Sequence, residues 1–503
     1  MLEVPKSDGY HDGFNEHLLR HVPSSAQRIL EVGCAQGRLG YELKRQQPTR
    51  TVLGIERDPA AAEVARTRLD DVFVCDVEVE LPDIAPGTLD CVIFGDVLEH
   101  LYDPEAILRT VRDLLSPDGV VLVCVPNICH FSIVKALLRA DPMYQPSGLL
   151  DATHIRFFSQ ATFIKMLLDV GLLPDVVDTI SSGGTDHVIP AATPLLDYVG
   201  VPPSRALRSL DAYQYIFRAT KLPTVDTPST PITFVACVND EDQLNSNLLR
   251  SPCLWPGTPH QLLPYRGMRS AADGFNEGLA NATNDLVVLV QQDVYLPQGW
   301  DQRFTDQVSQ AEQRFGPLGV IGTFGLRYHH GELEHLGCAV DRDTLLDFTG
   351  DLPAAVDGLD EIVLGVRRDS GLRAEPRLGF HLYGADLTLT AADAGLTNVV
   401  VDAPLFHNSL FAEVAASFHE SREVLLRKWP HVRPLCTNMG RFDTMSTPPP
   451  TPLEPAEVPE DSRDEQIADL RRRLDETEVA LDAVLGSRTW RMRGTLARMV
   501  GRT

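Results

Sequence analysis

The chain has 503 residues, a length that usually corresponds to two or three domains. Its formal net charge of −25 argues against nucleic acid as a partner, because phosphate backbones are bound by basic surfaces. The sequence contains neither a signal peptide pattern nor an apolar run of the roughly 18 residues that span a bilayer, which predicts a cytoplasmic protein. The nine scattered cysteines include no Cys-x-x-Cys pair, and we interpret them as reduced thiols.

The first half alternates between predicted strands and helices. Residues 29–32 form a predicted buried strand, which leads through Gly33 and Gly37 into a predicted helix at 38–46. Glycine at these two positions would let the backbone approach a ligand closely. The alternation predicts a parallel sheet covered on both faces, with ligand atoms at the carboxyl ends of its strands. The other predicted strands are 51–55, 72–75, 89–94, 119–125, 176–180 and 213–220, and the other predicted helices are 59–68, 104–115, 132–140 and 160–170.

Carboxylates stand at the ends of four predicted strands. Glu56 follows the glycine turn by about 20 residues, the spacing at which an acid accepts hydrogen bonds from a ribose diol. The other three are Glu31, Asp76 and Asp96. Alternatively, these acids are helix caps or solvated loop carboxylates. Their positions at the ends of successive strands argue against this alternative. A dehydrogenase is a rival hypothesis, but Ala35 interrupts the Gly-x-Gly-x-x-Gly pattern and the position of Asp76 also argues against it.

Four motifs together resemble the class I S-adenosylmethionine-dependent methyltransferases. They are residues 31–37, Glu56, Asp76-Val77 and residues 95–100, and the resemblance covers about residues 10–220. It implies a Rossmann-like α/β fold and S-adenosylmethionine as the cofactor. The residues that it implies for cofactor binding are Glu31, Gly33, Gly37, Glu56, Asp76, Val77 and Asp96.

Methyl transfer is an in-line displacement, and an acceptor hydroxyl also needs a base. His100 and His154 are the candidates for this base. His154 lies in residues 153–158, which resemble the substrate-side segment of methyltransferases that act on sugars and small molecules. A structural role is the alternative for both histidines, and for His100 we favour it.

The second half opens after a linker rich in proline and threonine at 221–231. Its predicted strands at 231–238 and 285–290, with the segment between them, resemble the family 2 type glycosyltransferases of GT-A fold. The resemblance runs from about 231 to 440. It implies a nucleotide-sugar donor whose diphosphate is bound through Mg²⁺ or Mn²⁺, with Asp293 as a ligand of the cation. Gln291 stands where that family usually has the first acid of Asp-x-Asp.

Two further positions carry the second resemblance. Asp386, in the segment 379–395, takes the place of the family's catalytic base at the head of a helix. The alternative for Asp386 is an acid that the helix dipole stabilises. His407 ends a predicted strand where the family often has a metal or phosphate ligand, and a structural histidine is the alternative.

The C-terminal part predicts a proline-rich linker at 446–460 and a helical tail at 461–503. Ile467, Leu474 and Leu481 fall seven residues apart, which predicts a short coiled coil over 465–485 for self-association or a partner helix. Residues 487–503 hold five arginines and no acid, and resemble the ends of bacterial surface-polysaccharide glycosyltransferases. This basic end predicts a weak contact with the inner face of the cell membrane.

The sequence therefore predicts a chain with two enzymes. The expected domains are a methyltransferase at 1–222 and a GT-A glycosyltransferase at 230–445. They would methylate a sugar hydroxyl and add a sugar to a growing, lipid-linked glycan acceptor in the biosynthesis of a bacterial surface polysaccharide. The rival hypothesis makes the second half a non-catalytic carbohydrate-binding module, because Asp-x-Asp is incomplete.

Overall fold

The computed structural model describes residues 13–442 apart from 141, 182, 184–191, 194–195, 197–200, 202, 330–331, 349, 410–415, 433–434 and 438–439. The described residues belong to one compact unit. The predicted linker at 446–460 and the coiled-coil and basic tail lie outside the described residues. Within those residues, no helix combines the length and the apolar character that crossing a bilayer requires.

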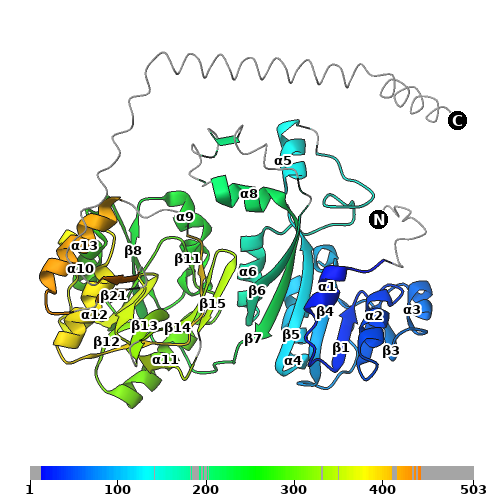
Figure 1. The fold of residues 1–503 in the computed structure, drawn as a ribbon, viewed down its shortest axis with the longest axis horizontal. Coiled ribbons are helices and arrows are strands. Elements are labelled where there is room, and N and C mark those ends of the chain that lie inside the picture. The colour runs from blue at the N-terminus through cyan, green and yellow to red at the C-terminus, as the bar shows by residue number, and fades with distance from the viewer. Residues whose placement is uncertain are drawn as a thin grey trace, which may run out of the picture. The chain divides into compact units, whose positions relative to one another are not determined.

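The first half builds a seven-stranded sheet in the order β3-β2-β1-β4-β5-β7-β6 (Figure 1). The first five strands in this order are parallel, and β7 is antiparallel to both of its neighbours. The predicted alternation is thus confirmed for the Rossmann-like part of the fold. The strands are β1 (Arg28–Val32), β2 (Thr51–Glu56), β3 (Asp71–Val74), β4 (Leu89–Gly95), β5 (Leu115–Pro126), β6 (Leu172–Ser181) and β7 (Ala212–Lys221).

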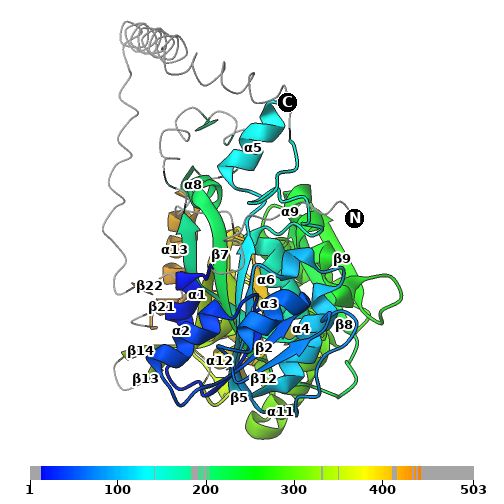
Figure 2. The ribbon, with the colours of Figure 1, turned by 90° about the vertical axis from the view of Figure 1, so that its right-hand side faces the viewer.

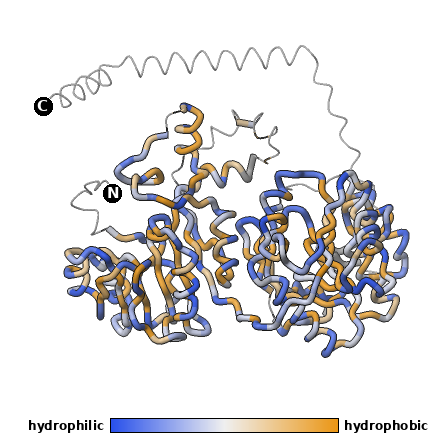
Figure 3. The backbone as a smooth tube through the Cα atoms, turned by 180° about the vertical axis from the view of Figure 1, so that it is seen from behind, coloured by the Kyte–Doolittle hydropathy of each residue, from blue (hydrophilic) through white to orange (hydrophobic). Residues whose placement is uncertain are grey.

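Helices cover both faces of this sheet because neighbouring strand residues point to opposite sides. Ile93 of β4 belongs to the apolar core with α1 (Glu16–His21), α2 (Arg38–Gln46) and α3 (Pro59–Ala65). Phe94 belongs to the core on the other face, with α4 (Pro104–Leu114) and α6 (Gln160–Asp169). The buried strands appear as hydrophobic segments in Figure 3.

Two helices lie beyond one end of the first sheet. They are α5 (Phe131–Leu138), which follows the carboxyl end of β5, and α8 (Pro203–Asp211), which precedes β7 (Figures 1 and 2). The predicted helix 59–68 is shorter in the structure, because α3 ends at Ala65 and a turn follows. Because β1, β2, β3 and β4 are parallel, their carboxyl ends share one edge of the sheet.

The second half contains a mixed sheet in the order β16-β19-β12-β18-β10-β8-β9. The pairs β9–β8 and β8–β10 are parallel, and β18 runs antiparallel between β10 and β12. These strands are β8 (Ile232–Val238), β9 (Gln261–Arg266), β10 (Leu286–Val290), β12 (Leu318–Gly322), β16 (Ala354–Ala355), β18 (Val363–Arg367) and β19 (Thr397–Val400). The larger helices are α9 (Glu241–Ser246), α10 (Ala271–Asn281), α11 (Trp300–Phe315), α12 (Tyr383–Asp393) and α13 (Ala416–Lys428).

A smaller sheet in the second half contains the strands β11-β20-β14-β13-β17, and β15 pairs with β14. The short strand β11 (Val294–Tyr295) pairs with β20 (Phe406–His407), and β20 also pairs with β14 (Glu332–Asp341). This pairing brings the residues after β10 next to His407, although more than a hundred positions separate them in the sequence. The remaining strands of this sheet are β13 (Phe324–His329), β15 (Thr344–Phe348) and β17 (Gly358–Leu359), and β21 (Leu435–Thr437) pairs separately with β22 (Gly440–Phe442).

Candidate functional site

The loop between β1 and α2 has a backbone that favours glycine. Gly33 and Gly37 have φ values of 70° and 71°, in the left-handed region. A Cβ built on Gly33 would lie 2.5 Å from Cγ2 of Val97. Ala35 adopts the same region with φ 45° in spite of its side chain. The loop therefore has a special, tightly packed conformation at the edge where the strands end.

Glu56, at the end of β2, reaches back to this loop. Its Oε2 accepts a hydrogen bond from the Ala35 backbone N–H at 2.8 Å, and its Oε1 accepts one from Asp58 at 2.9 Å. Each carboxylate oxygen has a second lone pair and can still accept from a ligand. Glu56 thus both fixes the glycine loop and offers acceptors beside it.

Glu31 lies buried under the same loop. Its Oε2 accepts a hydrogen bond from the Gly40 backbone N–H at 3.2 Å. Burial raises the pKa of Glu31 to about 8; the Gly40 hydrogen bond opposes this shift, and the charge of Glu56 adds to it. Asp76, after β3, is exposed and accepts from the Glu78 backbone, and Val77 is partly buried against the core that contains α4 and α6. The structure therefore places Glu31, Glu56 and Asp76 at the ends of β1, β2 and β3.

Asp96 follows β4 in a strained position, with φ 57°. Its side chain is reached by solvent, but it accepts hydrogen bonds from Gln214 of β7 and from the Cys124 thiol. The protein packed around the carboxyl group raises the pKa of Asp96, because it removes water from the charged form. Asp96 lies next to the short 3-10 helix η2 (Leu98–His100).

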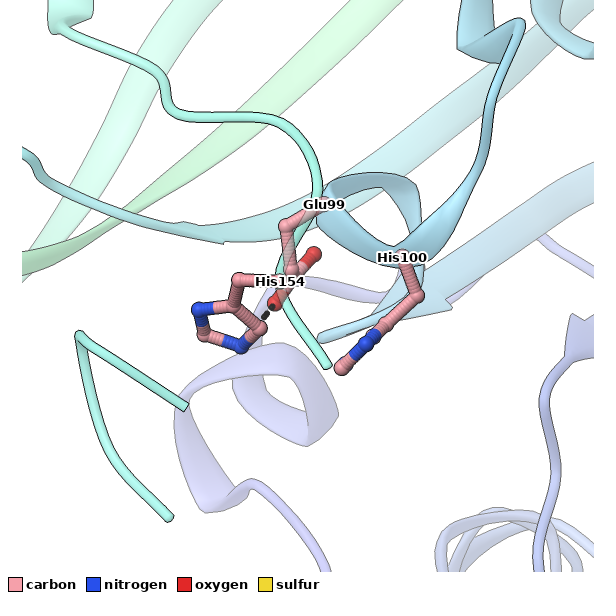
Figure 4. A group of neighbouring side chains, drawn as sticks. All are labelled: Glu99, His100 and His154. Carbon is pink, nitrogen blue, oxygen red and sulfur yellow. Dashed lines mark ion pairs between the residues drawn. The ribbon is translucent and has the colours of Figure 1, made fainter. Parts of the chain in front are cut away.

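Glu99, His100 and His154 form one cluster (Figure 4). Each offers a ligand atom, and these atoms lie within 4.8 Å of one another. The His154 Nε2 is 3.9 Å from Oε1 of Glu99, and the two imidazole rings meet edge to face with centroids 4.8 Å apart. The backbone brings the two segments together, because the Glu99 carbonyl accepts from the N–H groups of Ile155 and Arg156.

Both histidines have their Nδ1 next to a backbone carbonyl oxygen. His100 Nδ1 is 3.1 Å from the Thr153 oxygen, and His154 Nδ1 is 3.2 Å from the Leu149 oxygen. A carbonyl can only accept, so Nδ1 carries a proton in each ring, and in the neutral form of the ring Nε2 is the acceptor. This tautomer suits a base or a metal ligand.

Glu99 is the residue of this cluster that the sequence analysis did not single out. It is 0% exposed, and among the described residues neither carboxylate oxygen has a hydrogen-bond partner. Burial raises the pKa of Glu99 well above its ordinary value, and the charges of Asp96 and Asp151 raise it further. The sequence did contain a signal, because Glu99 stands beside His100 inside one of the four motifs.

A second polar cluster lies in the smaller sheet of the second half. His407 Nε2 is 3.6 Å from Oδ1 of Asp293 and 3.2 Å from Oε1 of Gln291. His407 Nδ1 is 3.3 Å from Oδ1 of Asp341, which the sequence analysis missed. Burial alone would lower the pKa of His407, but the two carboxylates raise it to about 10. Asp293 and His407, predicted from separate segments, are thus neighbours in the structure.

Asp386 has a different environment from the one expected of a base. It is 0% exposed in the first turn of α12. Lys428 Nζ donates to its Oδ2 at 2.8 Å, and Trp429 Nε1 donates to its Oδ1 at 2.8 Å. These contacts fix the residues at the end of α13 against α12. The arrangement fits the structural alternative better than it fits an accessible base.

Comparisons with known proteins identify the family of the first half. Residues 10–174 match the methyltransferase domain family. The ubiquinone biosynthesis O-methyltransferase of Neisseria meningitidis serogroup C (strain 053442) is 30% identical over 194 residues, which cover 37% of this chain and 79% of that protein. The protein of the same description from Xanthomonas euvesicatoria pv. vesicatoria is 30% identical over 169 residues, or 32% of this chain and 69% of that protein. Through its N-terminal part, the chain belongs to the class I S-adenosylmethionine-dependent methyltransferases.

A solved S-adenosylmethionine-dependent methyltransferase from Archaeoglobus fulgidus is also similar to this chain. It has a TM-score of 0.30 and 17% sequence identity, and the match covers 41% of this chain and 92% of that one. The match to the methyltransferase domain family ends at residue 174, before β7 and before both sheets of the second half.

Proposed function

We propose that the first half transfers a methyl group from S-adenosylmethionine to a hydroxyl of a small or carbohydrate acceptor. The observation that carries this proposal is the Glu99–His100–His154 cluster, close in the chain to an edge lined by strand-end carboxylates. The similarity to two proteins described as O-methyltransferases supports oxygen as the accepting atom. When bound, the cofactor supplies an electrophilic methyl carbon.

The residues present fit this cofactor. The glycine loop leaves Gly33 exposed at the ends of the strands, and Glu56 offers acceptors for ribose hydroxyls. Buried Glu31 would keep its charge more easily beside a cationic group such as the methionine ammonium. The residues that we propose to hold the cofactor are Glu31, Gly33, Gly37, Glu56, Asp76, Val77 and Asp96.

Glu99, His100 and His154 would hold a divalent cation that activates the acceptor hydroxyl. A buried carboxyl group without a hydrogen-bond partner, next to other acids, is costly unless a positive charge compensates it. Two imidazole nitrogens and a carboxylate form a ligand set that divalent transition metals accept, and a bound cation lowers the pKa of an oxygen ligand. If no cation binds, His154 serves directly as the base, with Glu99 beside its Nε2.

The test compares Glu99→Gln with Glu105→Gln, a half-buried glutamate on α4 that pairs with Arg109. Glu99→Gln should lose one bound cation in elemental analysis after dialysis against Mn²⁺ or Zn²⁺, and should keep affinity for S-adenosylmethionine. Its methyl transfer to phenolic and sugar acceptors should fall by about 100-fold or more, the usual contribution of such a group. Equal cation content and equal turnover in both variants would contradict the proposal.

We also infer that the second half binds a nucleotide-sugar donor through a cation held by Asp293 and His407, which would release its proton when the cation binds. The convergence of Asp293, Asp341 and His407 beside the end of β10 supports this inference. A hard cation there would neutralise charge on a leaving diphosphate. Sugar transfer to a lipid-linked glycan of a bacterial surface polysaccharide is the function that this half would then serve.

Cation stoichiometry separates the two proposed sites. The parent should bind two Mn²⁺ ions in the presence of a nucleoside diphosphate, whereas Asp293→Asn and Glu99→Gln should each bind one. Asp242→Asn, at an exposed position of α9, is the control and should bind two. Sugar binding that needs neither a cation nor Asp293 would instead support a carbohydrate-binding module.

A further inference from the structure

Helix α6 of the methyltransferase half makes polar contacts with the second half. Lys165 Nζ donates to the Ser246 backbone oxygen at 2.7 Å and to Oδ1 of Asn247 at 2.9 Å. One turn later, Asp169 accepts from the Tyr295 hydroxyl at 2.6 Å and from the Gln298 backbone N–H at 2.9 Å. Two ionisable side chains on one helix are therefore paired with the other half of the chain.

Apolar packing continues across the same contact. The Lys165 ammonium group lies over the rings of Tyr295 and Phe406, 5.1 and 5.4 Å from their centroids. These rings are 5% and 1% exposed, and both belong to the apolar core that contains α4 and α6. Cys338 and Val340 of β14 belong to that core as well. Four side chains of the second half thus complete the core of the first.

These four residues lie close in sequence to the second polar cluster. Tyr295 follows Asp293 by two positions, Val340 directly precedes Asp341, and Phe406 directly precedes His407. Adjacent residues of a strand point to opposite faces. In β14 and β20, Val340 and Phe406 therefore belong to the core around α6, while the adjacent Asp341 and His407 belong to the Asp293–Asp341–His407 cluster. Asp293 directly precedes β11.

The same helix begins just after the first site. Ser159 caps α6 through a capping box, and the segment before it contains His154 and Phe158. The Ile128 backbone N–H bonds to the Phe158 oxygen at 2.9 Å, which ties this segment to the end of β5. The start of α6 thus follows the segment that contains His154 of the Glu99–His100–His154 cluster. Further along α6, Lys165 and Asp169 bond to the second half.

We propose that α6 is the positioning element of the Asp293–Asp341–His407 cluster, so that the second site is complete only when the methyltransferase half supports it. Lys165, Asp169 and Tyr295 are positioning residues, because they would act on the cluster only through the strands that carry it. The role of α6 in holding these strands does not depend on any function of the second half. Its consequence for cation binding rests on the function proposed for the second half.

The experiment uses the full chain with Lys165→Met, which removes the charge and keeps most of the side-chain volume. Lys44→Met is the matched control, because Lys44 on α2 pairs with Asp70 inside the first half. Amide hydrogen exchange is followed at β11 and β20. Because Lys165→Met removes two hydrogen bonds from a charged donor, exchange there should quicken about ten-fold or more. Exchange in β1 and affinity for S-adenosylmethionine should match the control.

The cation readout is kept separate from the exchange readout. In a Glu99→Gln background, Lys165→Met should weaken Mn²⁺ binding at the second cluster about ten-fold. If the parent binds no cation there, the proposed glycosyltransferase site fails, while the exchange result still decides the role of α6. Unchanged exchange in β11 and β20 would overturn the inference.

Two conservative variants distinguish a local effect on β11 and β20 from unfolding of the whole Lys165→Met protein. Lys165→Arg should restore parent exchange rates, because it keeps the cation over the two rings. Tyr295→Phe removes only the hydroxyl that Asp169 accepts, and should produce a smaller change in the same strands. A Lys165→Met protein that unfolds as a whole while Tyr295→Phe leaves β11 and β20 unchanged would also overturn the inference.

Discussion

At the scale of single residues, the informative groups are the buried acids and what surrounds each of them. Glu31 and Glu99 are buried with raised pKa values, whereas buried Asp386 is paired with Lys428 and Trp429. Asp293 has His407 as a neighbour. Buried carboxyl groups are therefore candidate ligands at some positions, whereas the partners of Asp386 favour a structural role.

Glu31 should make stability depend on pH. Its ordinary pKa of 4.5 rises to about 8 in the folded protein, so between these values the folded state holds a proton that the unfolded chain has lost. Stability should therefore fall as the pH rises from about 5 to about 8 in the absence of cofactor. Urea denaturation should show this fall in the parent and in Glu16→Gln, which changes an exposed glutamate of α1. Glu31→Gln should show a smaller fall, and an identical slope in all three proteins would contradict the account.

Asp386→Asn should lower stability. The substitution leaves Lys428 without its buried carboxylate partner, although Trp429 can still donate to the amide oxygen. Because Lys428 is partly exposed, we expect a loss of about 1–2 kcal/mol rather than the larger cost of a fully buried pair. Chemical denaturation measures this loss. A variant with parent stability and no sugar transfer would instead identify Asp386 as the base of the second half.

At the scale of elements, local patterns predicted the strands of the first sheet, but they missed β9, β12, β13 and β14 of the second half and the contacts between elements. The predicted strands at 51–55 and 285–290 match β2 and β10 within one residue at each end. Each is a run of apolar residues that ends at a polar one, which is a local signal. The pairing of β11 with β20 joins residues 294–295 to 406–407, and no local pattern reports such a contact. For the same reason Asp341 was missed and the partners of Glu99 were unknown.

The glycine loop gives a prediction at this scale. Gly33→Ala should weaken S-adenosylmethionine binding and stability together, because it adds both backbone strain at φ 70° and a clash with Val97. Gly87→Ala is the matched control, since Gly87 has φ 72° but no atom within 4 Å of a built Cβ. The control should cost only the strain of about 1–2 kcal/mol and leave binding unchanged. Calorimetry and denaturation should separate the two variants, and equal effects would exclude a special role for the loop.

At the scale of the whole molecule, the described residues belong to one compact unit that contains the sheets of both halves. The linker predicted at 221–231 is itself held, because the Pro223 backbone oxygen accepts from Arg303 and the Thr227 hydroxyl donates to Asp306. The division of the chain at residues 222–230 into two domains stays a prediction. The sequence pattern predicted the parallel sheet of the first half, but the side chains that join the two halves, such as Lys165 and Tyr295, could not be recognised without the fold.

The central claim is that the first half is a methyltransferase that binds S-adenosylmethionine at the ends of its parallel strands. Calorimetry with Glu56→Ala tests it most directly, with Glu63→Ala, an exposed position of α3, as the control. The account predicts binding about ten-fold or more weaker in Glu56→Ala, because the variant loses charge-assisted hydrogen bonds worth about 1.5–3 kcal/mol. The control should bind as the parent does. Parent affinity in a folded Glu56→Ala protein, or no binding of S-adenosylmethionine by the parent, would contradict the claim.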